Sequence, residues 1–94
     1  MMSDMAFTVP LAKFLKARGE IYTVRKFRYS TRECYIEGVG CCDRRLIRRI
    51  TAPIELEPYV DLSGFSSLRD WEGKIHNFIK PTDDRFLYKV VIKK

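Results

Sequence analysis

Residues 41–51 read CCDRRLIRRIT, and the structure adopted by this run decides how the rest of the chain is arranged. Its four arginines stand in two pairs among three aliphatic residues. In a regular strand, Leu46 and Ile47 would point to opposite faces, each between arginines, and neither face would be apolar. A helix instead gathers the aliphatic residues on one side and the arginines on the other. The pattern therefore predicts a short helix capped by Asp43.

The chain before this run predicts a helix followed by a β-hairpin. Residues 8–19 begin with a capping threonine and a proline, and Gly19 suits the left-handed position that ends a helix. Residues 20–28 and 33–40 are rich in β-branched and aromatic residues, and the residues between them form a turn. We therefore expect these two strands to pair with each other in an antiparallel hairpin.

The chain after this run predicts a loop, a second helix and a last strand. Pro53 and Pro58 mark an irregular loop. Ser66 or Ser67 then caps a helix that runs to about Lys80. The buried stripe of this helix is expected to be Leu68, Trp71, Ile75, Phe78 and Ile79. The apolar residues 86–92 predict the closing strand.

Length and composition indicate one globular domain over residues 1–94. A chain of 94 residues with 46% apolar residues can build one small core. No apolar run is long enough to span a membrane, and Met1–Met5 lack the pattern of a signal peptide, so we expect a cytoplasmic protein. The chain has three cysteines, an odd number that favours reduced thiols, although two of them could form a disulfide in an oxidising cell.

The positive charge is confined to the first half of the chain. Residues 1–50 hold eleven Lys/Arg against five Asp/Glu, a net charge of +6, whereas residues 51–94 hold seven of each. A basic patch is the usual electrostatic mark of a nucleic acid or acidic protein partner. The alternative is a well-solvated surface without a partner.

Residue types used in catalysis and metal binding are present, but their spacing fits neither role. The only histidine, His76, falls on the polar side of the second helix, where a solvated or capping role is expected rather than that of a base. Cys34, Cys41 and Cys42 lie in or beside predicted strands and, with His76, do not match a four-ligand zinc pattern. No glycine-rich phosphate loop is present. We predict no metal, no cofactor and no catalytic residue.

The strongest functional signal is the mixture of rings and cations along the predicted hairpin. Cations neutralise phosphates and rings stack on bases, a combination typical of single-stranded nucleic acid binding. The candidates for backbone contacts are Arg25, Lys26, Arg28 and Arg32, with Arg44, Arg45, Arg48 and Arg49 as a second group, and those for stacking are Tyr22 and Tyr29. The structural alternative places Tyr22, Val24 and Phe27 in the core and leaves the cations to cover a strand.

The arrangement resembles the ASCH domain family of the PUA-like fold. The resemblance rests on Gly19 followed at once by a strand, on SGFSS at residues 63–67 leading into the helix of Trp71, and on the closing strand 86–92. It implies an α+β fold built on a small antiparallel, strongly bent β-barrel flanked by two or three helices. Members of the family are suspected RNA-binding modules, and some are small enzymes acting on modified nucleosides or RNA.

The family fingerprint, Gly-x-Lys-x-x-Glu-x-Arg with Thr sometimes in place of Glu, is only partly kept. Laid on Gly19, the Lys position holds Ile21, the Glu/Thr position holds Val24 and the Arg position holds Lys26. Because the groups needed for acid–base or nucleophilic work are lost, the resemblance implies binding more than catalysis.

Three functional hypotheses follow from the sequence. The first is a small basic module that binds nucleic acid, RNA in the first place, without catalysis. The second is an ASCH-type enzyme whose displaced catalytic groups come from Thr23, Arg25, Glu37 and Tyr88. The third is a protein-interaction module whose arginines meet an acidic partner.

Overall fold

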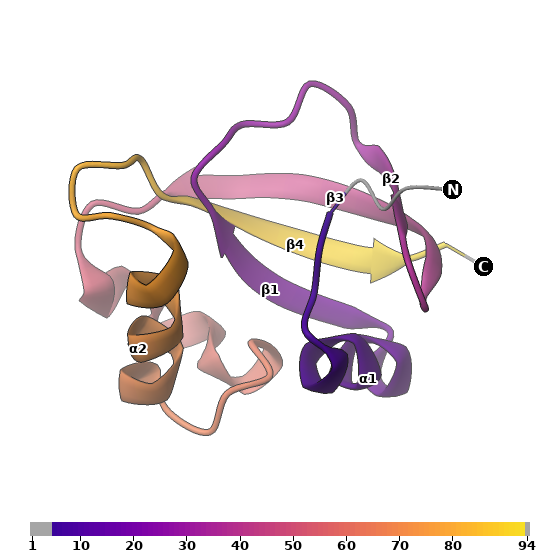
Figure 1. The fold of residues 1–94 in the computed structure, drawn as a ribbon, viewed down its shortest axis with the longest axis horizontal. Coiled ribbons are helices and arrows are strands. Elements are labelled where there is room, and N and C mark those ends of the chain that lie inside the picture. Colours follow the sequence, from indigo (N-terminus) through magenta and orange to yellow (C-terminus); the bar gives the residue numbers. More distant parts are fainter. Residues whose placement is uncertain (1–4, 94) are drawn as a thin grey trace.

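The computed structural model describes residues 5–93 and shows an α+β fold with a four-stranded antiparallel sheet and three helices (Figure 1). In chain order the elements are α1 (Val9–Arg18), β1 (Glu20–Arg25), β2 (Glu33–Ile36), β3 (Gly40–Arg49), the 3₁₀-helix η1 (Pro53–Leu62), α2 (Leu68–Phe78) and β4 (Phe86–Ile92). The predicted domain limits at Met1 and Lys94, and the absence of a signal peptide from the first four residues, fall outside the described residues.

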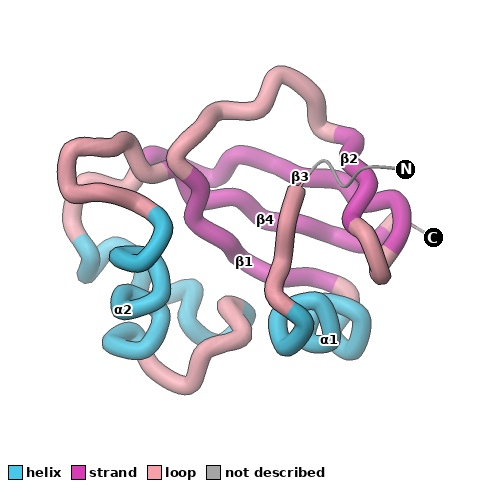
Figure 2. The backbone as a smooth tube through the Cα atoms, viewed as in Figure 1, coloured by secondary structure: helices cyan, strands magenta, loops and turns pink. Residues whose placement is uncertain are grey.

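The sheet has the strand order β1-β4-β3-β2, with β1 and β2 at its two edges (Figure 2). The predicted hairpin is therefore wrong, because β1 pairs with β4 and β2 pairs with β3. The loop over residues 26–32 carries the chain from one edge strand to the other, and the last strand of the chain is inserted between them. Within the described residues the sheet is open, so the predicted barrel is not confirmed.

Residues 41–49 of the run belong to the long strand β3, and the predicted helix is wrong. β3 pairs with β2 on one side and with β4 on the other. Its register with β4 shifts between Leu46 and Arg48, so Ile47 is an extra residue in a β-bulge. Ile47 lies on the sheet face opposite to that of Arg44, and after the bulge Arg48, opposite Leu87, lies on the same face as Ile47. Regular alternation therefore fails as a test for this strand.

Each face of the sheet carries its own core, in place of the single core expected from the chain length. Directly opposed residues share a face, so the register assigns the core residues to their sides. The first cluster, under α1, contains Met5, Leu15, Ile21, Cys34, Ile36, Cys42 and Val90. The second, under η1 and α2, contains Val24, Ile50, Leu56, Trp71, Ile75, Ile79 and Leu87.

The helix and strand limits near strong local signals agree with the sequence. α1 ends at Gly19, whose φ of +84° is the left-handed conformation expected there. Ser67 caps α2 by accepting a hydrogen bond from the Asp70 amide at 3.1 Å. β4 matches residues 86–92. Where a loop was expected after Pro53, the chain forms η1, and Leu56 is fully buried there.

Two expected features of α2 have different outcomes. Phe78, placed in the buried stripe, is the last residue of α2 and is 65% exposed. His76 is exposed, as expected. Across residues 5–93, no helix combines the length and the apolar character that crossing a membrane requires.

Candidate ligand-binding site

A pocket of about 580 Å³ opens beside the C-terminal end of β1. In Figures 1 and 2, β1 lies between α2 and the segment that leads into α1, and both of these contribute walls. The lining residues come from that segment, from β1 and the 26–32 loop, from α2 and from the residues beside it: Ala6, Phe7, Thr8, Leu11, Thr23, Val24, Arg25, Lys26, Phe27, Tyr29, Phe65, Trp71, Lys74, Ile75, Phe78 and Ile79. Segments distant in the sequence therefore build a single concave site.

Arg25 is the cation held in place within this site. Its Nε donates a hydrogen bond to Thr23 Oγ1 at 3.2 Å, and its Nη2 donates to the carbonyl oxygen of Ala6 at 2.8 Å. Its guanidinium carbon lies 4.7 Å from the centre of the Phe7 ring. Burial lowers the pKa of Arg25, and Tyr29 and Cys34 act in the opposite direction. Arginine nevertheless stays charged at neutral pH.

The charge in the pocket is entirely positive. Arg25, Lys26 and Lys74 line it, and its described lining contains no Asp or Glu. The two acceptors that hold Arg25 are neutral oxygens. An anionic group entering the pocket would therefore meet cations that no lining carboxylate neutralises.

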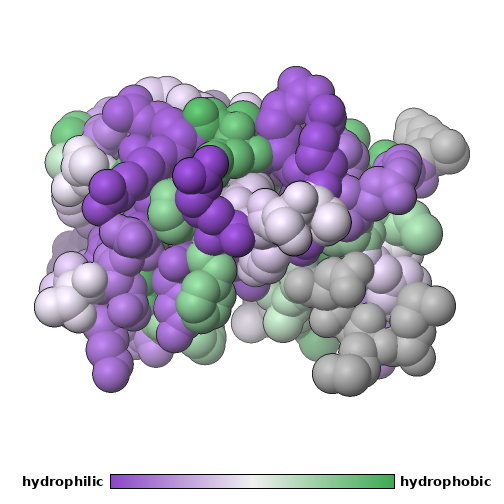
Figure 3. Space-filling view, turned by 90° about the horizontal axis from the view of Figure 1, so that it is seen from above, coloured by the Kyte–Doolittle hydropathy of each residue, from purple (hydrophilic) through white to green (hydrophobic). Residues whose placement is uncertain are grey.

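Two exposed rings stand at the rim of the pocket, each beside a lysine. Phe27 is 62% exposed, and Lys26 Nζ lies 5.3 Å from its ring centre. Phe78 is 65% exposed, and Lys74 Nζ lies 5.8 Å from its ring centre. Figure 3 views the molecule from the side of the 26–32 loop and shows hydrophilic residues over much of this face, with hydrophobic residues between them.

The contribution of α2 was missed from the sequence. Trp71 and Phe78 were assigned to one buried stripe. Trp71 is buried, as expected, but it also lines the pocket, and Phe78 is exposed at the pocket rim. A signal was present in Lys74 and Phe78, because a cation and a ring four residues apart lie side by side on a helix.

The first group of predicted binding residues is only partly brought together. Arg25, Lys26 and Tyr29 line the pocket. Arg28 is exposed in the same loop and makes no hydrogen bond or ion pair within residues 5–93. Arg32 leaves the site and pairs with Asp43 at 3.0 Å.

Tyr22 lies on the sheet face away from Thr23. Its ring meets that of Tyr59 edge-on at 4.9 Å, and Lys89 Nζ lies 5.8 Å from its centre. Tyr22 thus packs under η1, which agrees with the structural alternative for this residue.

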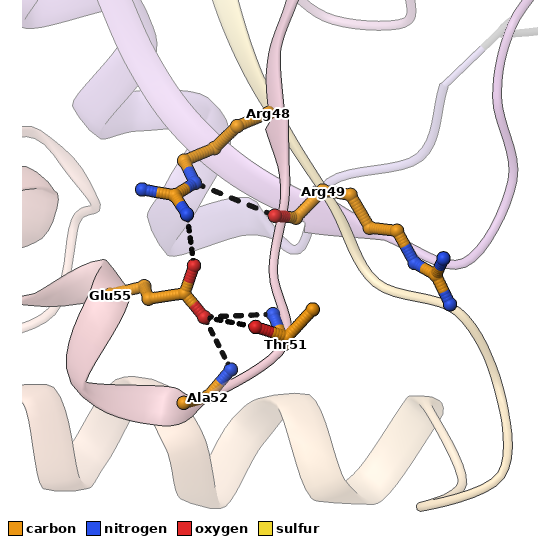
Figure 4. A network of polar contacts seen from close by, with 5 residues as sticks. All are labelled: Arg48, Arg49, Thr51, Ala52 and Glu55. Carbon is orange, nitrogen blue, oxygen red and sulfur yellow. Dashed lines mark hydrogen bonds and ion pairs between the residues drawn. The ribbon is translucent and has the colours of Figure 1, made fainter.

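The second group of predicted binding residues does not form one patch. Arg44 is only 6% exposed, contrary to the outward placement of all four arginines. Arg45 is exposed and lies opposite Lys89, on the other face of the sheet. Arg49 pairs with Asp84 at 2.7 Å, and Arg48 pairs with Glu55. In Figure 4, the guanidinium groups of Arg48 and Arg49 point away from each other.

Glu55 joins the end of β3 to the start of η1. Its carboxylate accepts hydrogen bonds from the Thr51 hydroxyl at 2.8 Å, from the Thr51 amide at 2.9 Å, and from the Ala52 amide and Arg48 (Figure 4). The bond from the Thr51 side chain is the largest of the contributions that lower the pKa of Glu55. Arg48 is therefore engaged in holding this corner.

Three of the four groups named for an enzymatic role lie together. Thr23 and Tyr88 are directly opposed across β1 and β4, and Arg25 bonds to Thr23. Glu37 lies apart, beside α1, in a second pocket that also contains Lys13. The arrangement thus gathers a hydroxyl, a phenol and a guanidinium without the carboxylate.

The described residues contain no group of three or more His, Cys, Asp or Glu suited to a metal ion. Cys34, Cys41 and Cys42 are free thiols. Burial raises the pKa of Cys42 to about 11, so its thiol is protonated at neutral pH.

Comparison of the chain with models of known protein families, with curated proteins and with solved structures found no match.

Proposed function

We propose that the protein binds single-stranded nucleic acid, RNA in the first place, by taking one base into the pocket beside β1. The observation that carries this proposal is the composition of the pocket lining. The lining contains aromatic rings and cations, and its described residues include no Asp or Glu. A nucleotide combines an aromatic ring with a negative phosphate, so it matches both properties. The volume of about 580 Å³ lies within the ordinary range for small ligand sites.

Each part of the site has a role in this proposal. Phe27 and Phe78 offer ring faces on which neighbouring bases stack, because every base has a π face. Lys26, Arg28 and Lys74 contact phosphates at the rim, where they are exposed. Arg25 presents its remaining N–H groups to the base or its phosphate, since Thr23 and Ala6 already hold its orientation.

The ASCH-like relationship is part of the same proposal. It is supported by the loop at Gly64 and Phe65, which leads into α2 and supplies Phe65 to the pocket. In this view the open four-stranded sheet is a reduced form of the bent barrel of that family.

A titration of fluorescent single-stranded RNA tests the proposal. Phe27→Ala should weaken binding by about 1–3 kcal/mol, the usual contribution of one stacked ring. Arg25→Met should also weaken it, because the pocket loses its fixed cation. Arg45→Met is the matched control for net charge, since Arg45 lies on β3 opposite Lys89 and does not line the pocket. No binding at low salt, or binding unchanged in both pocket variants, would refute the proposed function.

A second candidate is an enzyme acting on a modified nucleoside in the same pocket. It is favoured by the contact of Arg25 with Thr23 and by Tyr88 directly opposite Thr23. The absence of a carboxylate from the described lining makes binding the better supported function. Turnover of modified cytidines that is lost in Thr23→Val and Tyr88→Phe would instead establish the enzyme.

A further inference from the structure

Arg44 is a buried cation beneath the 26–32 loop, outside the set of pocket-lining residues. It stands on β3, on the sheet face that carries the first core cluster, and is 6% exposed. Its Nε donates to the carbonyl oxygen of Thr31 at 2.9 Å, and its Nη2 donates to Thr31 Oγ1 at 3.0 Å. Its guanidinium carbon lies 3.9 Å from the centre of the Tyr29 ring. Arg44 thus holds two residues of one loop.

Burying Arg44 in this way is unfavourable for the free energy of folding, so its role is not explained by stability alone. Arg44 is in none of the ion pairs between described residues, and its Nη1 is buried without a hydrogen-bond partner. Burying a charge without an opposite charge is unfavourable, and apolar residues of similar size often stabilise a fold as well or better. The benefit of arginine here therefore lies in its geometry, since its planar group both stacks and donates in fixed directions.

The residues that Arg44 holds belong to the wall of the pocket. Tyr29 lines the pocket, and Lys26 and Phe27 of the same loop stand at its rim. The Tyr29 amide also donates to the Tyr88 hydroxyl at 2.8 Å, and the two rings meet edge-on at 5.3 Å. Tyr29 is therefore held by contacts from two strands of the sheet, with Arg44 on β3 and Tyr88 on β4.

We propose that Arg44 is a positioning residue that orders the 26–32 loop as the wall of the nucleic acid site before the ligand arrives. This inference rests on the proposed function of the pocket. A loop that is already ordered spares the ligand the entropic cost of ordering it, so binding is tighter. Arg44 acts through Tyr29 and Thr31 and does not touch the ligand.

The test combines RNA affinity with amide hydrogen exchange in the free protein. Arg44→Met removes the charge but keeps a long side chain, and we expect an affinity loss of about tenfold. Faster exchange of the Tyr29 amide should accompany it, with no fall in the thermal midpoint. Arg44→Lys should not restore affinity, because an ammonium group cannot stack on the Tyr29 ring or donate two hydrogen bonds in fixed directions as a planar guanidinium does. Arg45→Met, with the same change in net charge, should leave both readouts unchanged.

Two variants at other residues that hold the loop, Thr31 in the loop and Tyr88 on β4, keep the test decisive if Arg44→Met does not fold. Thr31→Val removes one acceptor of Arg44, and Tyr88→Phe removes the acceptor of the Tyr29 amide. Each should speed exchange in the loop and weaken RNA binding. Wild-type exchange and wild-type affinity in these variants, or in a folded Arg44→Met, would overturn the inference. If the unaltered protein binds no RNA, the proposed function fails, and unchanged exchange rates would then separately exclude ordering of the loop by Arg44.

Discussion

At the scale of single residues, five arginines of this chain fall into two kinds that the sequence does not distinguish. Arg32, Arg48 and Arg49 each meet a carboxylate supplied by a distant or neighbouring element. Arg25 and Arg44 are held by neutral oxygens and aromatic rings instead. The first kind joins elements together, and the second kind leaves uncompensated positive charge at or beside the pocket.

The carboxylate of Glu55 gives a prediction about pH at this scale. Its hydrogen bonds from Thr51 and Ala52 and its ion pair with Arg48 lower the pKa of Glu55 below the ordinary value of 4.5. A lowered pKa in the folded state stabilises the fold above that ordinary value, and the stabilisation is lost as pH falls through the folded pKa. We expect Glu55→Gln to be less stable than the unaltered protein at neutral pH, with the difference shrinking in acid.

Urea unfolding at about pH 7 and about pH 3 measures this difference. Glu57→Gln is the matched control, because Glu57 lies in the same 3₁₀-helix, is exposed, and its side chain makes no hydrogen bond or ion pair within the described residues. A Glu55→Gln deficit that is equally large in acid would show that the carboxylate charge does not carry the stabilisation.

At the scale of elements, local signals were sufficient where they were strong. The N-cap at Ser67 and the left-handed Gly19 are set by backbone geometry within a few residues, so the adjoining ends of α2 and α1 were predicted well. β3 was missed because it is stabilised by pairing with two other strands and because a bulge at Ile47 interrupts its alternation. Neither the pairing partners nor the bulge can be inferred from the residues of the strand alone.

Two glycines with nearly the same backbone give a prediction at the element scale. Gly19 and Gly64 have φ of +84° and +85°, and alanine at either costs roughly 1–2 kcal/mol in that conformation. A Cβ at Gly19 meets nothing within 4 Å, whereas one at Gly64 comes within 2.6 Å of Leu11 Cδ2. We expect Gly64→Ala to lower the free energy of unfolding by about 1 kcal/mol more than Gly19→Ala does.

Chemical denaturation of both variants measures the two losses. In a Leu11→Ala background, the additional cost at Gly64 should disappear, because the contacted side chain is gone. Equal losses for the two glycines in the unaltered background would show that the contact between the 63–67 loop and α1 adjusts freely.

At the scale of the whole molecule, the placement of β4 organises both the sheet and the site. As the last strand of the chain, β4 lies between β1 and β3 and thereby separates the two strands that were expected to form a hairpin. β1 becomes an edge strand, and its C-terminal end is left between α2 and the segment that leads into α1. The pocket exists only because these three segments converge.

The number of cations free to meet phosphates gives a prediction for the whole molecule. If all eight cations singled out from the sequence met phosphates, the slope of log K against log salt would be about −6. The structure places Arg25, Lys26 and Lys74 in the pocket lining and leaves Arg28 exposed in the 26–32 loop, so we expect a slope of about −2 to −3 for single-stranded RNA. Titrations over a series of salt concentrations measure this slope. A value near −6 would indicate that the arginines outside the site also take part.

The sequence by itself determined the α+β class, the ends of α1 and α2 at Gly19 and Ser67, and the strand β4, because caps, turns and apolar runs act over a few residues. It also pointed to Arg25, Lys26 and Tyr29, which do line the pocket. Only the tertiary structure decided the strand order, the bulged strand at CCDRRLIRRIT, the burial of Arg44 and the part played by α2 in the pocket. These features depend on contacts between residues far apart in the chain, which no local pattern encodes.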